Sequence, residues 1–445
     1  MSSEFLSDLD VFETIEGSEL PHDYLCPNLK TLVFNIDDEA SIHIPLFLSP
    51  KVVHVDIHLP YNWPTPSLPD LPLRYPELRT LHLDHHSWWD GCRSTISKVV
   101  LTLHRIEDLA LPGVDRAALE HISQLPALRL LTLEALVWED LGPSPRLYSM
   151  IDAETPRFSA LREIYLVHTT MDLVIELLEL LSSCRLASFH VGTGDPVTRA
   201  ITTQLYAALE THLTHSTLQT LRIGLPENEV DDALGDVLTN YTIDGSIVVP
   251  LLRFANLTTI YLSPPVGFDL DDTMTLAIAR AWPKVRELSL TASTHTRCPS
   301  SISLLGLKAF AEHCHELTSL TITFDASTVP PFDDSLKTIA SQSSLTFLGV
   351  EMSSINDPRA VASFLSPCFP KLANIKTYDY WLWDELNRMG DTYTGDDPAY
   401  IRCIRWMEVE WRVRSKRFSE EFDSDAWDSC ASDSDMSEVI LGSDS

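Results

Sequence analysis

One short phrase of apolar and polar residues recurs along the whole chain. It reads PNLKTLVF at 27–34 and returns as PELRTLHL at 76–83 and PALRLLTL at 126–133. Every copy fits the template L-x-x-L-x-L, whose alternation predicts a short strand with one buried face. Thirteen copies occur, and their first apolar residues are Leu29, Val52, Leu78, Ile106, Leu128, Leu161, Leu186, Leu218, Leu257, Val285, Leu317, Leu345 and Leu372.

The spacing of the copies indicates a leucine-rich repeat. From Leu29 to Leu372 the chain makes twelve steps that average about 28.6 residues, and leucine-rich repeats run to about 29 residues per turn. The steps vary from 22 to 39 residues, and the longest follows Leu218. We therefore expect an irregular array in which individual turns carry insertions.

Segments with helical spacing of apolar residues lie between the copies. Asp271 and Asp357 precede two of them, and an Asp oxygen can accept the free N–H groups of a first helical turn. A single turn cannot bury enough apolar surface to fold alone, so the turns must stack. We predict an α/β solenoid, curved as a horseshoe, with about 13 parallel inner strands and outer helices at 116–125, 172–181, 198–213, 271–282, 302–314, 333–340 and 358–365.

Composition excludes several classes of partner. The 445 residues hold 64 acidic and 32 basic side chains, and this net charge of −32 repels nucleic acid and acidic membranes. No GxGxxG or GxxxxGK[ST] run is present, and the eight cysteines form no CxxC pair. The first residues are acidic and do not resemble a signal peptide. We expect a monomeric cytoplasmic or nuclear protein with no metal and no cofactor.

The chain divides into four predicted regions. Residues 1–25 form an N-terminal segment or cap, 26–378 the solenoid, 379–418 an aromatic segment with a capping helix, and 419–445 a disordered acidic tail. The capping helix starts after Asp396-Asp397-Pro398 and has one apolar face. The C-terminal end of this helix is basic, with Arg412, Arg414, Lys416 and Arg417. These cations either complement the helix dipole or form a docking patch for a partner or a nuclear-import receptor.

The PxLxxLxL copies, several of them preceded by Cys26, Cys184 or Cys314, resemble the repeat region of fungal F-box proteins, which are similar to ribonuclease-inhibitor-type solenoids. The resemblance implies a receptor in which an F-box docks the adaptor of a cullin ubiquitin ligase and the repeats hold the substrate. Leu20-Pro21 matches the opening of an F-box, but the first repeat begins within eight residues of it. We expect the F-box itself to be absent from this chain: either the chain has lost it, or the start codon is misplaced, or another protein supplies the link. The adaptor is expected as a partner of this chain only if an F-box is supplied upstream.

The same resemblance exposes a second departure from the family pattern. Such repeats usually carry an Asn three residues past the last template Leu. Here those slots are filled by His86, Leu136, Thr169, Pro265 and Ser293.

Alternation within each strand sends the third and fifth template positions to the concave side. This side carries a mixture in which His, Tyr and hydroxyl side chains dominate, and it is either a solvated sheet face or a protein-binding surface. The candidate contact residues are His54, Asp56, His82, Asp108, Glu163, Tyr165, His190, Arg222, Tyr261, Glu287 and Phe347.

A catalytic alternative rests on a cluster of potential ligands. Adjacent strands can bring His54, Asp56 and His82 together, which would suit a metal-assisted hydrolase. The neighbouring HLDHH run matches no zinc motif, and no GxSxG elbow is present, so we expect the chain not to be an enzyme. Three tryptophans lie near this cluster in the sequence: Trp63, Trp88 and Trp89. They either anchor a partner or fill gaps where the Pro-rich insertion 60–76 folds back on the array.

Overall fold

The computed structural model describes eleven stretches of the chain. They are residues 24–35, 44, 46–59, 75–85, 90–134, 157–182, 184–224, 238–292, 300–331, 342–378 and 398–418. Contacts divide the chain into two compact units, Met1–Ile302 (unit 1) and Ser303–Ser445 (unit 2). The predicted helix at 333–340 and the acidic tail lie outside the described residues.

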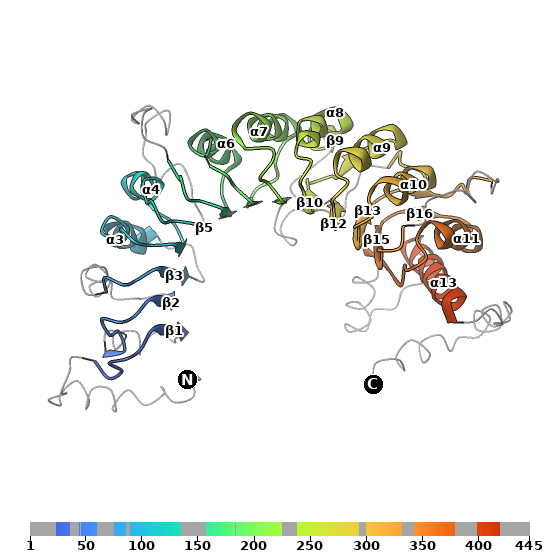
Figure 1. Cartoon of the computed structure of the whole chain (residues 1–445). Helices are drawn as coiled ribbons and strands as arrows, with labels where there is room; N and C mark the ends of the chain where they lie inside the picture. Colours follow the sequence, from blue (N-terminus) through green and yellow to red (C-terminus); the bar gives the residue numbers. More distant parts are fainter. Residues whose placement is uncertain are drawn as a thin grey trace. The chain divides into compact units, whose positions relative to one another are not determined.

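Unit 1 is built around parallel strands that follow one another in chain order (Figure 1). Each strand begins at the third position of a template copy, so the repeat pattern located the strands correctly. The strands are β1 (Thr31–Asn35), β2 (His54–Leu59), β3 (Thr80–His85), β4 (Asp108–Leu111), β5 (Leu130–Glu134), β6 (Glu163–Val167), β7 (Ser188–Gly192), β8 (Thr220–Gly224), β10 (Thr259–Ser263) and β12 (Glu287–Leu290).

Unit 2 continues the same pattern with β13 (Ser319–Ile322), β15 (Phe347–Glu351) and β17 (Asn374–Thr377). With the ten strands of unit 1, the described residues thus form the thirteen parallel strands that the thirteen copies predict. Two short parallel pairs accompany them: β9 (Ile243–Asp244) with β11 (Phe268–Asp269), and β14 (Asp325–Ala326) with β16 (Ser354–Ile355). The predicted α/β repeat architecture is confirmed, whereas the curvature of the complete array stays a prediction.

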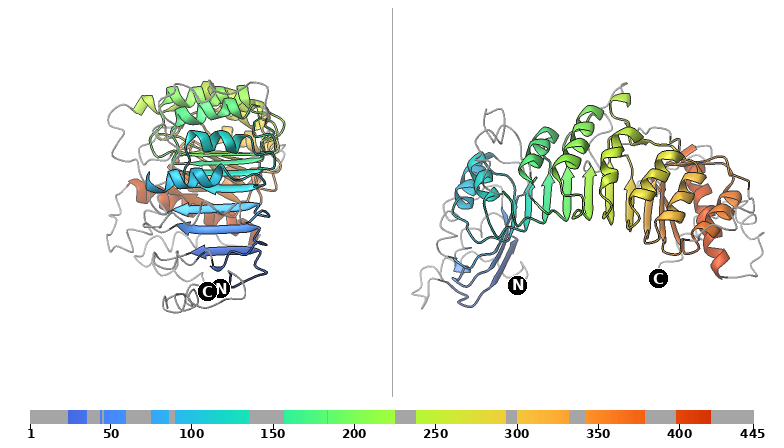
Figure 2. Two further views of the ribbon diagram at one scale, coloured as in Figure 1. Left: turned by 90° about the vertical axis from the view of Figure 1, so that its left-hand side faces the viewer. Right: turned by 45° about the horizontal axis from the view of Figure 1, so that its top comes forward.

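The helices of unit 1 lie on one side of its strands, which leaves the other side without helices (Figure 2). The predicted caps are present: Asp271 accepts a hydrogen bond from Met274 N, and in unit 2 Asp357 accepts one from Ala360 N. The sequence pattern missed α3 and the turn formed by α8 and η6. The helices of unit 1 are α3 (Asp90–Val100), α4 (Arg116–Ser123), α6 (Met171–Leu180), α7 (Arg199–His212), η5 (Leu238–Asn240), α8 (Gly245–Val248), η6 (Val249–Arg253) and α9 (Asp272–Ala281).

The template residues form the core between strands and helices. In the copy around β6, Leu161, Ile164 and Leu166 are at most 1% exposed, and the template residues of the other copies of unit 1 are also buried, apart from the half-buried Leu29 of the first copy. Burial of such a side chain stabilises the fold by roughly 1.5–3 kcal/mol, so each copy adds to a continuous core. Trp282, at the end of α9, is fully buried and donates a hydrogen bond from Nε1 to Leu251 O at 3.3 Å.

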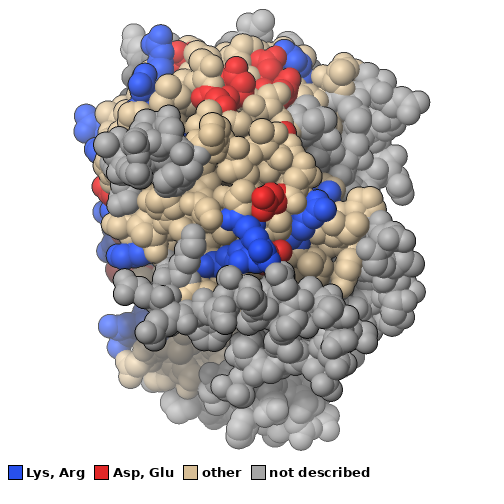
Figure 3. Space-filling model, turned by 90° about the vertical axis from the view of Figure 1, so that its right-hand side faces the viewer, with Lys and Arg blue, Asp and Glu red and all other residues tan. Residues whose placement is uncertain are grey.

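Unit 2 carries α10 (Leu304–His313), α11 (Pro358–Cys368) and α13 (Pro398–Phe418). The last of these packs against α11 and β17, and its Trp406 donates a hydrogen bond to Ser353 O at 2.9 Å. On the face of the molecule drawn in Figure 3, several Lys and Arg side chains lie together, with a few Asp and Glu side chains among them. Arg412 pairs with Glu408 and Arg414 with Glu410, so these two cations of the basic end stabilise the helix itself.

Candidate protein-binding face

The helix-free side of unit 1 presents two registered rows of side chains, which we call the inner face. All twenty positions are half-buried or exposed, as the period-2 alternation predicts. The first row is Thr31, His54, Thr80, Asp108, Leu130, Glu163, Ser188, Thr220, Thr259 and Glu287. The second row is Val33, Asp56, His82, Ala110, Thr132, Tyr165, His190, Arg222, Tyr261 and Ser289.

Ten of the eleven predicted contact residues lie on this inner face. The eleventh, Phe347, belongs to unit 2, where it lies in register with Ser319 and Asn374. The same strand of unit 2 holds Gly349, whose position a side chain could not occupy, because an added Cβ would meet Thr321 at 2.6 Å. The inner face therefore gathers the predicted residues in unit 1, in two clusters.

The first cluster covers β2 to β4. The imidazole rings of His54 and His82 meet edge to face, with 5.6 Å between their centroids. His82 Nε2 lies 3.0 Å from Asp108 Oδ1, and because an ionised carboxylate only accepts, the imidazole donates this hydrogen bond. Asp56 is the register partner of His82, but the hydrogen bond goes to Asp108.

This first cluster bears on the hydrolase alternative. No group of three or more His, Cys, Asp or Glu side chains among the described residues is arranged to hold a metal ion. The side chains of Asp84, His85, His86 and Asp90 lie outside the described part, as do Trp63, Trp88 and Trp89. Within the described residues, the cluster is a hydrogen-bonded His–Asp pair in edge-to-face contact with a second imidazole.

The second cluster covers β6 to β10. Tyr165, His190, Arg222 and Tyr261 are register neighbours on successive strands. The rings of Tyr165 and His190 lie 4.2 Å apart between centroids, and Tyr165 Oη donates a hydrogen bond to Glu163 Oε2 at 3.1 Å. Burial, followed by the charge of Glu163, raises the pKa of Tyr165 above its usual value. This second cluster is a preorganised aromatic patch with one adjacent cation.

Two glycines lie beside this patch, and no sequence pattern indicated them. Gly192 and Gly224 are register partners at the ends of β7 and β8. A side chain at Gly192 would meet nothing within 4 Å, whereas one at Gly224 would contact Ser263 and Tyr261. Among the described residues the inner face is therefore open above Gly192, which lies two residues beyond His190 on the same strand.

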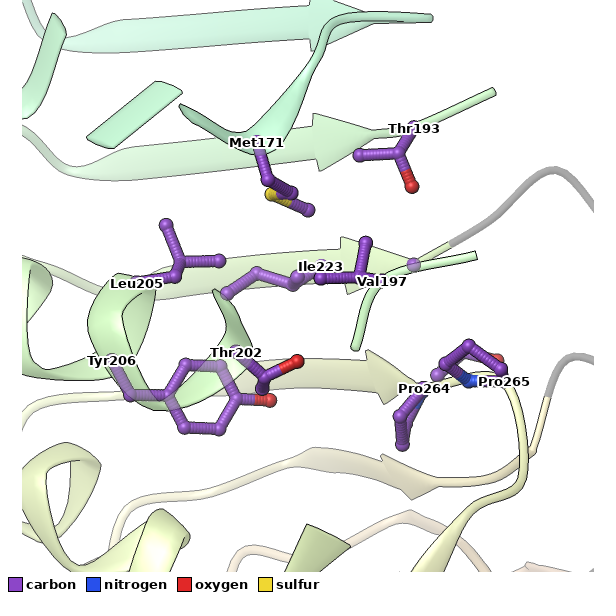
Figure 4. A pocket seen from close by; sticks show the side chains of 11 residues that line it. Met171, Thr193, Val197, Thr202, Leu205, Tyr206, Ile223, Pro264 and Pro265 are labelled. Carbon is purple, nitrogen blue, oxygen red and sulfur yellow. The ribbon is translucent and has the colours of Figure 1, made fainter. Parts of the chain in front are cut away.

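A small cavity lies behind Gly224, between the ends of the strands and α7 (Figure 4). Its volume of about 20 Å³ has room for roughly one water molecule. Its lining is mostly apolar and includes the fully buried Tyr206. A cavity of this size does not accommodate an organic substrate.

His190 gives the second cluster a testable pH dependence. Burial, followed by the charge of Arg222, lowers the pKa of His190 to about 4, so the imidazole is neutral near pH 7. Its pKa in the unfolded chain is about 6.5, so its contribution to stability is complete above pH 6.5 and is lost as the pH falls towards 4. NMR titration should give a midpoint near pH 4 that rises in the Arg222→Ala variant. A midpoint near 6.5 in the wild type would contradict the packing of this cluster.

Comparisons with known proteins yield a structural likeness. No protein-family model matches the sequence, and no curated protein matches it. Among the matching solved structures is a chain of the crystal structure of the Rad7 and Elc1 complex in yeast, with 15% identity, 63% of this chain and 72% of that chain covered, and a TM-score of 0.32. The fold assignment therefore rests on the strand register. None of the described helices is long and apolar enough to span a bilayer.

Proposed function

We propose that this chain is a non-enzymatic protein-recognition module whose inner face holds a protein ligand. The supporting observation is the registered, helix-free surface of unit 1, in which polar, aromatic and charged side chains continue over ten strands. At about 4.8 Å between strands, nine spacings extend over roughly 43 Å. A surface of that length suits a folded protein better than a small molecule.

The cellular role that fits this module is substrate recognition or scaffolding, related to the F-box receptors of cullin ubiquitin ligases. The support for this narrower role is the likeness of the PxLxxLxL copies to the repeats of that family. The ligand would bind on the inner face of a monomeric chain in the cytoplasm or nucleus.

The order within the two clusters supports the proposal that this face binds a partner. Tyr165 is held by a hydrogen bond and by ring contact, and His82 is held in the same two ways. Side chains fixed before binding lose less conformational entropy when a partner covers them. Tyrosine and arginine are also the side chains that most often dominate binding energy.

Site-specific photo-cross-linking in cells tests this function. The photo-reactive amino acid p-benzoylphenylalanine replaces Tyr165 or Tyr261 on the inner face, and in a matched control it replaces Gln204, an exposed residue of α7. We expect one discrete protein adduct from both inner positions and none from Gln204. Mass spectrometry of the adduct, and of co-purified cullin subunits, identifies the assembly. Equal labelling at all three positions, or none at the inner ones, would contradict the proposal.

A further inference from the structure

Arg222 is exceptional on the inner face. It is the one Lys or Arg among the twenty positions, which also hold Asp56, Asp108, Glu163 and Glu287. Its side chain is exposed and makes no ion pair or hydrogen bond with the residues that the structure describes. Elsewhere in unit 1, exposed arginines do find carboxylates, as Arg79 does with Glu107 and Arg253 with Glu210. The guanidinium of Arg222 therefore keeps its full capacity to bind an anion.

The surroundings of Arg222 restrict what can reach it. Along the row it lies between His190 on β7 and Tyr261 on β10, and Tyr165 stacks on the far side of His190. His190 is neutral near pH 7, so Arg222 carries the positive charge of the patch. Register neighbours on both sides carry aromatic rings, so a partner that covers Arg222 also excludes water from it, and a charge-assisted hydrogen bond is stronger where water is excluded.

The opening above Gly192 supplies room beside this cation. Gly192 follows His190 by two residues on the same strand, and a Cβ added at Gly192 would meet no described residue within 4 Å. A partner's main chain can approach the sheet closely where no Cβ intervenes. Gly224, the register partner of Gly192 on β8, does not share this room, because an added Cβ there would contact Ser263 and Tyr261.

We propose that Arg222 anchors the protein ligand by binding the carboxylate of a single Asp or Glu in a segment whose chain passes over Gly192 beside the rings of His190 and Tyr165. The inference rests on the proposed function and specifies the chemistry of the partner. A single planar guanidinium matches one carboxylate through two parallel hydrogen bonds. The four carboxylates of the inner face and the net charge of −32 repel a doubly charged phosphate more strongly than the single charge of one Asp or Glu side chain.

A phage-displayed library of random peptides serves as the probe, with the full-length chain immobilised. Peptides selected on the wild type are measured against Arg222→Ala, Arg222→Glu and the charge-matched control Arg129→Glu, which alters an exposed arginine just before β5. We expect selected peptides to share an Asp or Glu and to bind Arg222→Ala roughly 10- to 100-fold more weakly. Arg129→Glu should bind them like the wild type.

A charge reversal makes the test specific. Replacing the shared acidic residue of a selected peptide by Lys should abolish binding to the wild type and restore part of it in Arg222→Glu. Selected peptides without an acidic residue, equal affinity for Arg222→Ala, or no selection at all would overturn the inference.

Failure of this inference and failure of the proposed function give different results. If only the inference is wrong, the adducts at Tyr165 and Tyr261 persist and Arg222→Ala captures the same protein partner as the wild type. If the inner face binds no protein, both inner positions fail to form adducts, whatever residue occupies position 222.

Discussion

Replacing Trp282 with alanine is expected to lower the free energy of unfolding of unit 1 by about 3–5 kcal/mol. The indole is fully buried at the end of α9, and Nε1 donates its hydrogen bond to Leu251 O in η6. Alanine removes both the hydrogen bond and the packing between these two elements, and it leaves a cavity. A urea titration in which the hydrogen exchange of the β10 and β12 amides serves as the readout measures the loss of unfolding free energy.

Two further variants make the Trp282 prediction specific. Trp282→Phe keeps a ring and should lose clearly less stability than Trp282→Ala. Val249→Ala alters a residue that is 52% exposed in η6 and should change stability by no more than about 0.5 kcal/mol. A loss below about 1 kcal/mol for Trp282→Ala would show that α9 and η6 do not depend on this indole.

Replacing Gln342 with alanine should destabilise unit 2 by about 2–4 kcal/mol. Its buried side chain connects two successive turns: Nε2 donates to Leu317 O at 2.6 Å and to Cys314 O at 3.2 Å, and Oε1 accepts from Leu345 N at 2.8 Å and from Ser344 N at 3.1 Å. Alanine leaves buried backbone groups without partners. Hydrogen exchange of β13 and β15 in increasing urea reports the change.

The controls for Gln342 separate polarity from shape. Gln342→Met keeps the length of the side chain but provides neither donor nor acceptor, so it should lose nearly as much stability as alanine. Ser343→Ala changes the exposed neighbour and should have little effect. If Gln342→Met were as stable as the wild type, the hydrogen bonds would contribute nothing and packing alone would explain the site.

The fold could be predicted from the sequence because a single physical constraint is repeated. A strand that buries alternate residues needs an apolar side chain at every second position, and the L-x-x-L-x-L phrase satisfies that need at each turn. The start of β7 at Ser188 and of β12 at Glu287 therefore followed from the pattern alone. Helix α3 did not, because DGCRSTISKVV interrupts its apolar period with polar residues.

The site could be predicted only as a set of positions. Alternation places His82, Asp108 and Arg222 on the inner face, but it does not predict which carboxylate forms a hydrogen bond with His82. His82 pairs with Asp108 on the next strand, and that choice depends on side-chain conformations that have no sequence period. The hydrogen bonds through Gln342 could not be predicted for the same reason. The two carbonyl groups that accept from its Nε2 lie 25–28 residues earlier in the chain.

The order of the strands in unit 1 has an evolutionary consequence. Because neighbours in the sheet are also neighbours in the sequence, each column of two inner residues is encoded within one short continuous stretch. Duplication, deletion or exchange of one such stretch would add, remove or replace one strand with its two inner-face residues, and it would leave the inner-face residues of the strands on either side intact. Binding specificity in this architecture can therefore diverge by recombination as well as by point substitution.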